Sequence, residues 1–165
     1  IRHSSRSRRI SMKAAAVYLA SYKGTHSGPA GLINVGIRKL DKAQYSHSEI
    51  CIGNPFDVDA ECFSSSGIDG GVRMKQMQLS REKWDVVHLH WVPELQVRDH
   101  FALRQGVRYD HCGTGRFAVP WLLREHPERD FCSEFCGAAM GLYEAWRVSP
   151  QGLHSIALSM GATQI

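Results

Sequence analysis

The residue best placed for nucleophilic chemistry is a cysteine at the start of a helix-forming stretch. In HPERDFCSEFCGAAMGLYEAW, residues 126–146, Asp130 is a candidate helix N-cap and Cys132 falls in the first turn. The buried stripe of this helix would be formed by Phe135, Ala138, Ala139 and Leu142. Unpaired N–H groups and the macrodipole at a helix N-terminus favour a thiolate. The same N–H groups can hold the oxyanion of a tetrahedral intermediate, so Cys132 is a candidate nucleophile.

A cysteine nucleophile needs a group that takes up a proton and later gives it to the leaving group, and histidine suits this task. In YSHSEICIG, residues 45–53, alternation predicts a strand on which Tyr45, His47, Glu49 and Cys51 share one face. An imidazole and a carboxylate are therefore expected on the same face of a strand that precedes the cysteine helix by about eighty residues.

The other cysteines have simpler interpretations. Cysteine is among the most buried residue types, so Cys136 on the helix and Cys51 and Cys62 on strands are expected in the core. Cys112, in a loop, is the rival nucleophile. An odd number of scattered cysteines is not typical of a disulfide framework, so we expect reduced thiols.

Other chemistries fit the sequence less well. His88 and His90 share a strand face, but the chain has no CxxC pair and no HExxH motif, so we expect no metal and no cofactor. GIDGGVR, residues 67–73, has no following helix and is expected to be a turn and not a phosphate loop. Ser64, Ser65 and Ser66 lack the G-x-S-x-G pattern and are expected to be turn hydroxyls.

Short strands joined by tight turns must position these residues. Strands are expected at 14–21, 45–53, 57–66, 72–79 and 84–92, in an antiparallel meander. Helices are expected around 32–40, from Pro93 to Gly106, around 117–123, after Asp130, and after the N-cap pair Ser149-Pro150. The fold class is therefore α+β, with a small antiparallel sheet packed against helices.

The bulk properties point to one domain with no strong charge. Residues 1–11 hold four arginines and no acid, and are expected to be a disordered leader before a single domain at 12–165. Without these arginines, sixteen basic residues face sixteen acidic ones, so a nucleic-acid partner is not expected. No apolar run is long enough to span a membrane, and AAAVYLA is interpreted as a buried strand, not a signal peptide. Cytoplasmic synthesis is expected; later export to the cell envelope or another cell, and the oligomeric state, stay open.

Several short motifs, taken in order, resemble one family. YSHSEICIG is followed by SSSGIDGGVRMK, GVRYD, FCSEFCGAAMGL and SPQGL. This order is similar to the circularly permuted, YiiX-type branch of the NlpC/P60 papain-like cysteine hydrolase superfamily, and more distantly to the lecithin:retinol acyltransferase group. The similarity covers most of residues 14–155, and its specific parts are S-H-x-E on the strand and F-C-S-E at the helix start. It implies a permuted papain-like fold with a barrel-like sheet, in which the histidine strand precedes the cysteine helix.

The resemblance also implies roles for individual residues. Cys132 would be the nucleophile, and His47 would be the base and later the acid. A third polar residue would orient the imidazole; Glu61, expected across the hairpin, is favoured over Glu49, which is ~7 Å further along the same strand. Glu134 is expected to complement the helix dipole. The implied activity is hydrolysis of an amide, isopeptide or ester bond through an acyl-enzyme, with cell-wall peptides as the preferred substrate. A lipid acyltransferase or thioesterase and a non-catalytic binding module are the alternatives.

Overall fold

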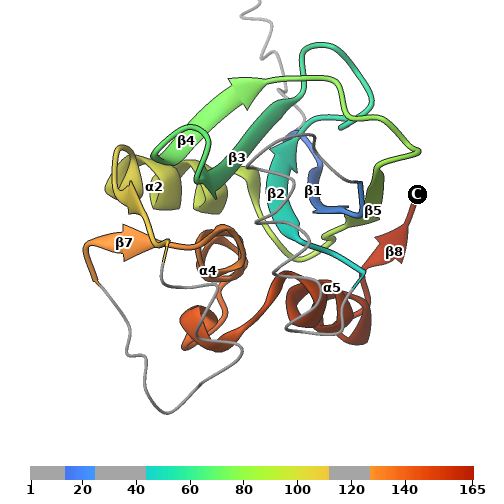
Figure 1. Cartoon of the computed structure of the whole chain (residues 1–165). Coiled ribbons are helices and arrows are strands. Elements are labelled where there is room, and N and C mark those ends of the chain that lie inside the picture. The colour runs from blue at the N-terminus through green and yellow to red at the C-terminus, as the bar shows by residue number, and fades with distance from the viewer. Residues whose placement is uncertain (1–13, 25–43, 112–126) are drawn as a thin grey trace, which may run out of the picture.

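The computed structural model describes residues 14–24, 44–111 and 127–165, and this part of the chain has an α+β fold. A curled, eight-stranded sheet packs against helices (Figure 1), which confirms the α+β class. The sheet is mixed and not wholly antiparallel as expected, because two of its short strands pair in parallel. The strands are β1 (Val17–Tyr22), β2 (His47–Ile52), β3 (Glu61–Ser66), β4 (Gly71–Gln76), β5 (Trp84–His88), β6 (Arg108–Tyr109), β7 (Arg129–Asp130) and β8 (Thr163–Gln164). The helices are α2 (Glu94–Arg104), α4 (Cys132–Ala139), α5 (Pro150–Ser159) and a short 3-10 helix, η1 (Ala145–Arg147). The expectations for 1–11, 32–40, 117–123 and Cys112 lie outside the described residues.

The strand order confirms the predicted meander for four strands and corrects it for the fifth. β4, β3, β2 and β1 are consecutive antiparallel neighbours, but β5 pairs with β1 and not with β4. After β4 the chain crosses the β2–β3 loop, where Met77 and Leu79 donate backbone hydrogen bonds to Ala60 and Pro55. This crossing carries the chain to the free side of β1. The two-residue strands β6, β7 and β8 were not expected, because they are too short to show periodicity.

Alternating side chains give the sheet two buried faces. The face toward α4 and α5, here called the helix face, carries Val17, Leu19, Ile50, Ile52, Phe63, Val72 and Val87. The opposite face carries Ala20, Cys51, Cys62 and Val86, covered by Ala60 and Leu79. Burial on both faces explains why AAAVYLA, residues 14–20, which includes most of β1, is a continuous apolar run. Each large apolar side chain buried in this way stabilises the fold by about 1.5–3 kcal/mol, so the two faces fix the strand register.

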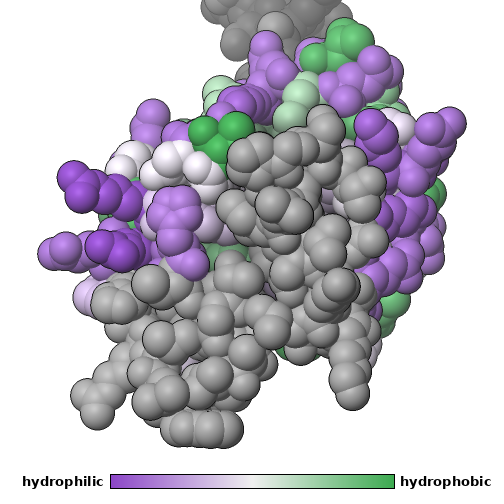
Figure 2. Space-filling model, in the orientation of Figure 1, coloured by the Kyte–Doolittle hydropathy of each residue, from purple (hydrophilic) through white to green (hydrophobic). Residues whose placement is uncertain are grey.

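The helices cover the helix face and present a mainly polar exterior. α2 ends just before Gly106, and Ser149 caps α5 by accepting a hydrogen bond from the Gly152 N–H at 3.1 Å, both as predicted. On the visible surface that the structure describes, hydrophilic side chains predominate and apolar ones lie in separate patches (Figure 2). Among these described residues, no helix has the length and apolar character needed to cross a membrane.

Candidate functional site

Cys132 is the first residue of α4. It lies one position closer to the N-terminus of the helix than the sequence predicted. The N-cap is Phe131, in an extended conformation, and not Asp130. The first hydrogen bond of the helix runs from the Phe135 N–H to the Phe131 carbonyl at 3.0 Å, so the N–H groups of Cys132 and Ser133 precede the helical ladder. Cys132 therefore sits at the positive end of the macrodipole.

Asp130 has a different task from the capping role predicted for it. Its carboxylate is almost fully buried and accepts hydrogen bonds of 2.9 and 2.7 Å from Arg104 at the end of α2. Its carbonyl oxygen accepts a 2.7 Å hydrogen bond from the Ser65 hydroxyl on β3. Asp130 thus fixes the segment that leads into α4 against both the sheet and α2, and it sets where the helix begins.

Cys132 and His47 meet where α4 and β2 both begin. Burial lowers the pKa of His47, but the charge of Cys132 and hydrogen bonding with Cys132 and Glu49 outweigh burial and raise this pKa to about 10. The thiol is therefore within interaction range of the imidazole, as the sequence and the resemblance led us to expect. An imidazole in contact with a cysteine sulfur can take up the thiol proton, and the thiolate is the form that attacks a carbonyl.

The pair is reached by solvent from the histidine side. The Cys132 side chain has no exposed surface and packs with Tyr109 and Phe131. The His47 side chain keeps 21% of its surface exposed and lies near the edge of the Trp84 ring, with ring centroids 6.2 Å apart. A substrate whose carbonyl is attacked by the sulfur must therefore displace part of the Tyr109 and Phe131 covering or enter past His47.

The carboxylate that contacts His47 is Glu49. Its Oε1 lies 2.8 Å from the His47 Nε2, and the two residues share a sheet face as predicted. The Cα separation of ~7 Å along one strand is bridged because both side chains are long. Glu49 is 1% exposed, so the carboxylate end of this contact is buried.

The preference for Glu61 as the partner of His47 was wrong. Glu61 is opposite Ile52 in the β2–β3 register, five residues and roughly 17 Å from His47 along the strand. Its parity also places it on the helix face, and its carboxylate pairs with Arg98 of α2. The hairpin loop is long enough to shift the register away from the pairing that the sequence analysis favoured.

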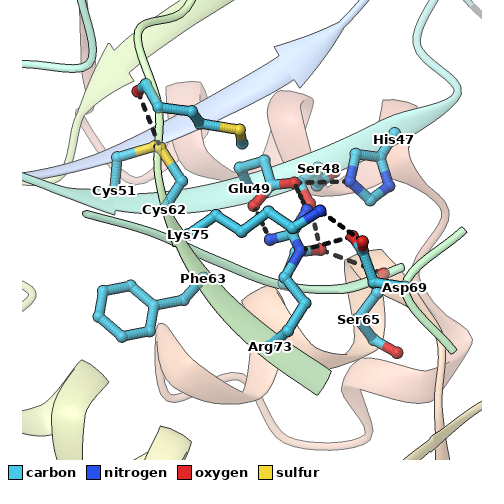
Figure 3. Close-up of polar contacts among 12 residues, drawn as sticks. His47, Ser48, Glu49, Cys51, Cys62, Phe63, Ser65, Asp69, Arg73 and Lys75 are labelled. Carbon is cyan, nitrogen blue, oxygen red and sulfur yellow. Dashed lines mark hydrogen bonds and ion pairs between the residues drawn. The ribbon is translucent and has the colours of Figure 1, made fainter. Parts of the chain in front are cut away.

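Arg73 on β4 is the second partner of Glu49, and its role was not predicted. Its Nη1 and Nη2 donate to the two Glu49 oxygens at 2.6 and 2.5 Å (Figure 3). Glu49 on β2 and Arg73 on β4 lie on the two strands that flank β3. Arg73 pairs with Ser64 of β3, and the pairing of Ile50 with Phe63 puts Glu49 beside the same serine, whose small side chain leaves room for the guanidinium. Burial raises the pKa of Glu49, but hydrogen bonds from Arg73 and His47 outweigh burial and lower it, so the carboxylate is ionised.

Asp69, in the turn before β4, holds Arg73 from its other side. Its Oδ2 accepts a 3.0 Å hydrogen bond from the Arg73 Nε, and its Oδ1 accepts one from Lys75. Burial raises the pKa of Asp69, but the hydrogen bonds from Lys75 and Arg73 outweigh burial and lower it to about 2. A line of alternating charges therefore runs from the turn to the thiol, through Asp69, Arg73, Glu49 and His47.

One signal in the sequence could have revealed Arg73. The strand HSEICI is otherwise apolar or small, so a glutamate inside it requires a buried cation. GIDGGVR, interpreted as a turn alone, supplies that cation from the following strand. Similarly, Ser64 and Ser65 are not turn hydroxyls: they lie on β3, where Ser64 donates to the Ser48 carbonyl at 2.6 Å.

Other features lie apart from the Cys132–His47 pair. A cavity of about 460 Å³ is lined by residues of α2, α4 and η1, among them His100, Arg104, Glu134 and Trp146, but not by Cys132 or His47. Glu134 accepts from the Phe131 N–H at 3.4 Å, in keeping with the dipole role predicted for it.

His88, the last residue of β5, and His90, which follows the strand, also lie apart from the Cys132–His47 pair. The His88 and His90 rings are 4.1 Å apart, and β5 is not an edge strand, because β8 pairs with it. In the ranges 14–24, 44–111 and 127–165, no three potential metal ligands cluster.

Comparison with known proteins adds no relative. The chain matches no protein-family model, and no curated protein is detectably similar to it in sequence.

Proposed function

We propose that the protein is a cysteine hydrolase that cleaves an amide, isopeptide or ester bond through an acyl-enzyme on Cys132. The observation that carries the proposal is the interaction of Cys132, at the first position of α4, with His47, whose other partner is the buried Glu49. A thiolate, an imidazolium and an orienting carboxylate are the components of a thiol triad.

Each group has a step in the proposed reaction. The Cys132 thiolate attacks the carbonyl carbon, and the carbonyl electron pair moves to oxygen, where N–H groups at the start of α4 stabilise it. As the tetrahedral intermediate collapses, His47 gives its proton to the leaving amine or alcohol. Water then attacks the thioester with His47 as base, which releases the acid and restores the thiol pair. Glu49 holds the imidazole in one orientation throughout.

The order of the parts supports a permuted papain-like arrangement. The histidine strand β2 precedes the cysteine helix α4, and α4 packs against β2 and β3 on the helix face. The substrate we propose is a peptide or acyl compound, with a cell-wall peptide as the preferred class. Transfer of the acyl group to an acceptor other than water uses the same residues and belongs to the same proposal.

The burial of the thiol favours one competing function. A sulfur with no exposed surface, packed against Tyr109 and Phe131, also suits a binding module that keeps the fold without turnover. In such a module the other side chains of the site would be structural, and alkylation of Cys132 would be slow.

Trapping of the acyl-enzyme tests the proposal. Purified protein is offered peptidoglycan fragments, peptide amides and acyl esters, and intact-mass spectrometry follows the covalent adduct. We expect an adduct on Cys132 and product release in the wild type, and neither a thioester adduct nor product in Cys132→Ser and Cys132→Ala. In His47→Gln we expect both adduct formation and product release to be much slower, because His47 serves both steps. Absence of any adduct and any product across the panel favours the binding module.

A further inference from the structure

The Glu49 carboxylate is shared by two cations in a site that water hardly reaches. Its Oε1 accepts from both the His47 Nε2 and the Arg73 Nη2, while its Oε2 accepts from the Arg73 Nη1. Glu49 is 1% exposed and the Arg73 side chain is 15% exposed. Both cations therefore act on the carboxylate with little screening by solvent.

We propose that Arg73 is a positioning residue that keeps the Glu49 carboxylate ionised after His47 has given its proton to the leaving group. The inference rests on the proposed function, which it deepens by assigning the guanidinium a task in one step. Arg73 does not touch the substrate and acts through Glu49 and His47.

The charges around Glu49 change when His47 gives its proton to the leaving group. Before this proton transfer, the positive charge of His47 offsets the negative charge of Glu49, and the negative charge of Asp69 offsets the positive charge of Arg73. When His47 transfers its proton, the bond between the carbonyl carbon and the leaving atom breaks, its electron pair stays with the leaving atom, and His47 becomes neutral. Glu49 then has Arg73 as its remaining cation.

Without Arg73, the same step would leave a buried carboxylate with no counter-ion. A buried charge without a partner is strongly disfavoured, so the proton would stay on His47 or move to Glu49. Either result makes His47 a poorer acid. An amide must have its leaving nitrogen protonated, whereas an aryl ester releases a stable phenolate, so loss of Arg73 affects amide cleavage far more than aryl ester cleavage.

The geometry also fixes Arg73 itself. The guanidinium binds Glu49 through both Nη atoms and Asp69 through Nε, which uses the planar fork on two sides. Lysine at this position keeps the positive charge but not the fork, so Arg73→Lys is the conservative variant. Arg98 offers a matched control, because it also joins carboxylates of two elements, Glu61 and Glu94, away from His47.

The first experiment measures protonation directly and needs no substrate. In Cys132→Ala, which lacks the sulfur charge as the acyl-enzyme does, NMR follows the His47 ring nitrogens and the Glu49 carboxyl carbon against pH. We expect Glu49 to stay ionised while His47 loses its proton. With Arg73→Met added, we expect the His47–Glu49 pair to hold that proton at least tenfold more tightly, a rise of one pKa unit or more. Loss of the proton at the same pH in both proteins overturns the inference, and so does protonation of Glu49 in Cys132→Ala itself, which does not depend on the folding of the Arg73 variant.

The second experiment uses matched substrates with one acyl group and either an amine or a nitrophenol leaving group. In Arg73→Met we expect the ratio of amide to ester cleavage to fall at least tenfold, with recovery of most of the ratio in Arg73→Lys and no change in Arg98→Met. An equal fall for both substrates indicates a structural role only and overturns the inference. If the wild type cleaves neither substrate and forms no adduct, the proposed function fails, whereas the NMR result still decides the charge argument.

Discussion

Replacement of Arg73 by methionine removes the main counter-ion of a carboxylate that water cannot reach. Glu49 is 1% exposed and loses two hydrogen bonds, of 2.6 and 2.5 Å, while its contact with His47 remains. The methionine side chain fills much of the volume of the arginine stem, so the change tests charge more than packing.

The expected loss of stability follows from which partner is removed. Removing one member of a buried ion pair costs about 3–5 kcal/mol. Glu49→Gln costs less, about 1.5–3 kcal/mol, because Arg73 keeps its bond with Asp69. The double variant should cost less than the two single variants together by about 2 kcal/mol, since residues in direct contact are coupled. Arg98→Met, whose side chain is 41% exposed, should cost no more than about 1 kcal/mol.

Urea unfolding at pH 7, followed by circular dichroism, measures these four free energies of unfolding. Arg73→Met should lower the free energy of unfolding clearly more than Arg98→Met, and its coupling with Glu49→Gln should be favourable. Equal costs for the two arginine variants, or a double variant whose cost is the simple sum, would show that the Arg73–Glu49 contact is solvated and weak.

Three further predictions concern single groups. The His47 imidazole should titrate near pH 10 in the wild type by NMR, and its pKa should fall in Cys132→Ala, because the charge of Cys132 is the largest influence that raises it; an unchanged pKa would place the thiol elsewhere. Asp69 has a lowered pKa, so its contribution to stability is present above about pH 4 and is lost as the pH falls through about 2; Asp69→Asn should flatten this acid limb in unfolding measurements, and an unaltered limb would contradict the assignment. Gly71→Ala should destabilise the protein by more than 2 kcal/mol in thermal unfolding, because its Cβ would lie 2.0 Å from the Val107 carbonyl oxygen; a variant as stable as the wild type would mean that β4 and the chain after α2 are further apart.

The sequence predicted the elements whose periodicity is long enough to be recognised. The first four strands, α2, α4 and the Ser149 cap of α5 lie where alternation, helical spacing and capping residues placed them. The placement of β5 beside β1 could not be foreseen, because the path after β4 is set by long-range backbone hydrogen bonds at Met77 and Leu79. Two-residue strands such as β6 and β7 depend wholly on tertiary contacts.

For the candidate site, the sequence identified the residues but not all their partners. Cys132 and His47 come together as expected, and the shared face of His47 and Glu49 follows from strand parity. The choice between Glu61 and Glu49 depended on the hairpin register, which the composition of an eight-residue loop does not determine. Arg73 was missed because a turn motif was interpreted by its glycines and not by the cation that follows them.

The rate at which Cys132 is alkylated tests the central claim most directly. Iodoacetamide labelling at pH 6–7, resolved by peptide mass spectrometry, compares this thiol with the buried thiols of Cys51, Cys62 and Cys136. Our account predicts that Cys132 reacts at least tenfold faster than these three and that His47→Ala removes most of this advantage. A Cys132 that reacts as slowly as the core cysteines, or at a rate indifferent to His47, would contradict it.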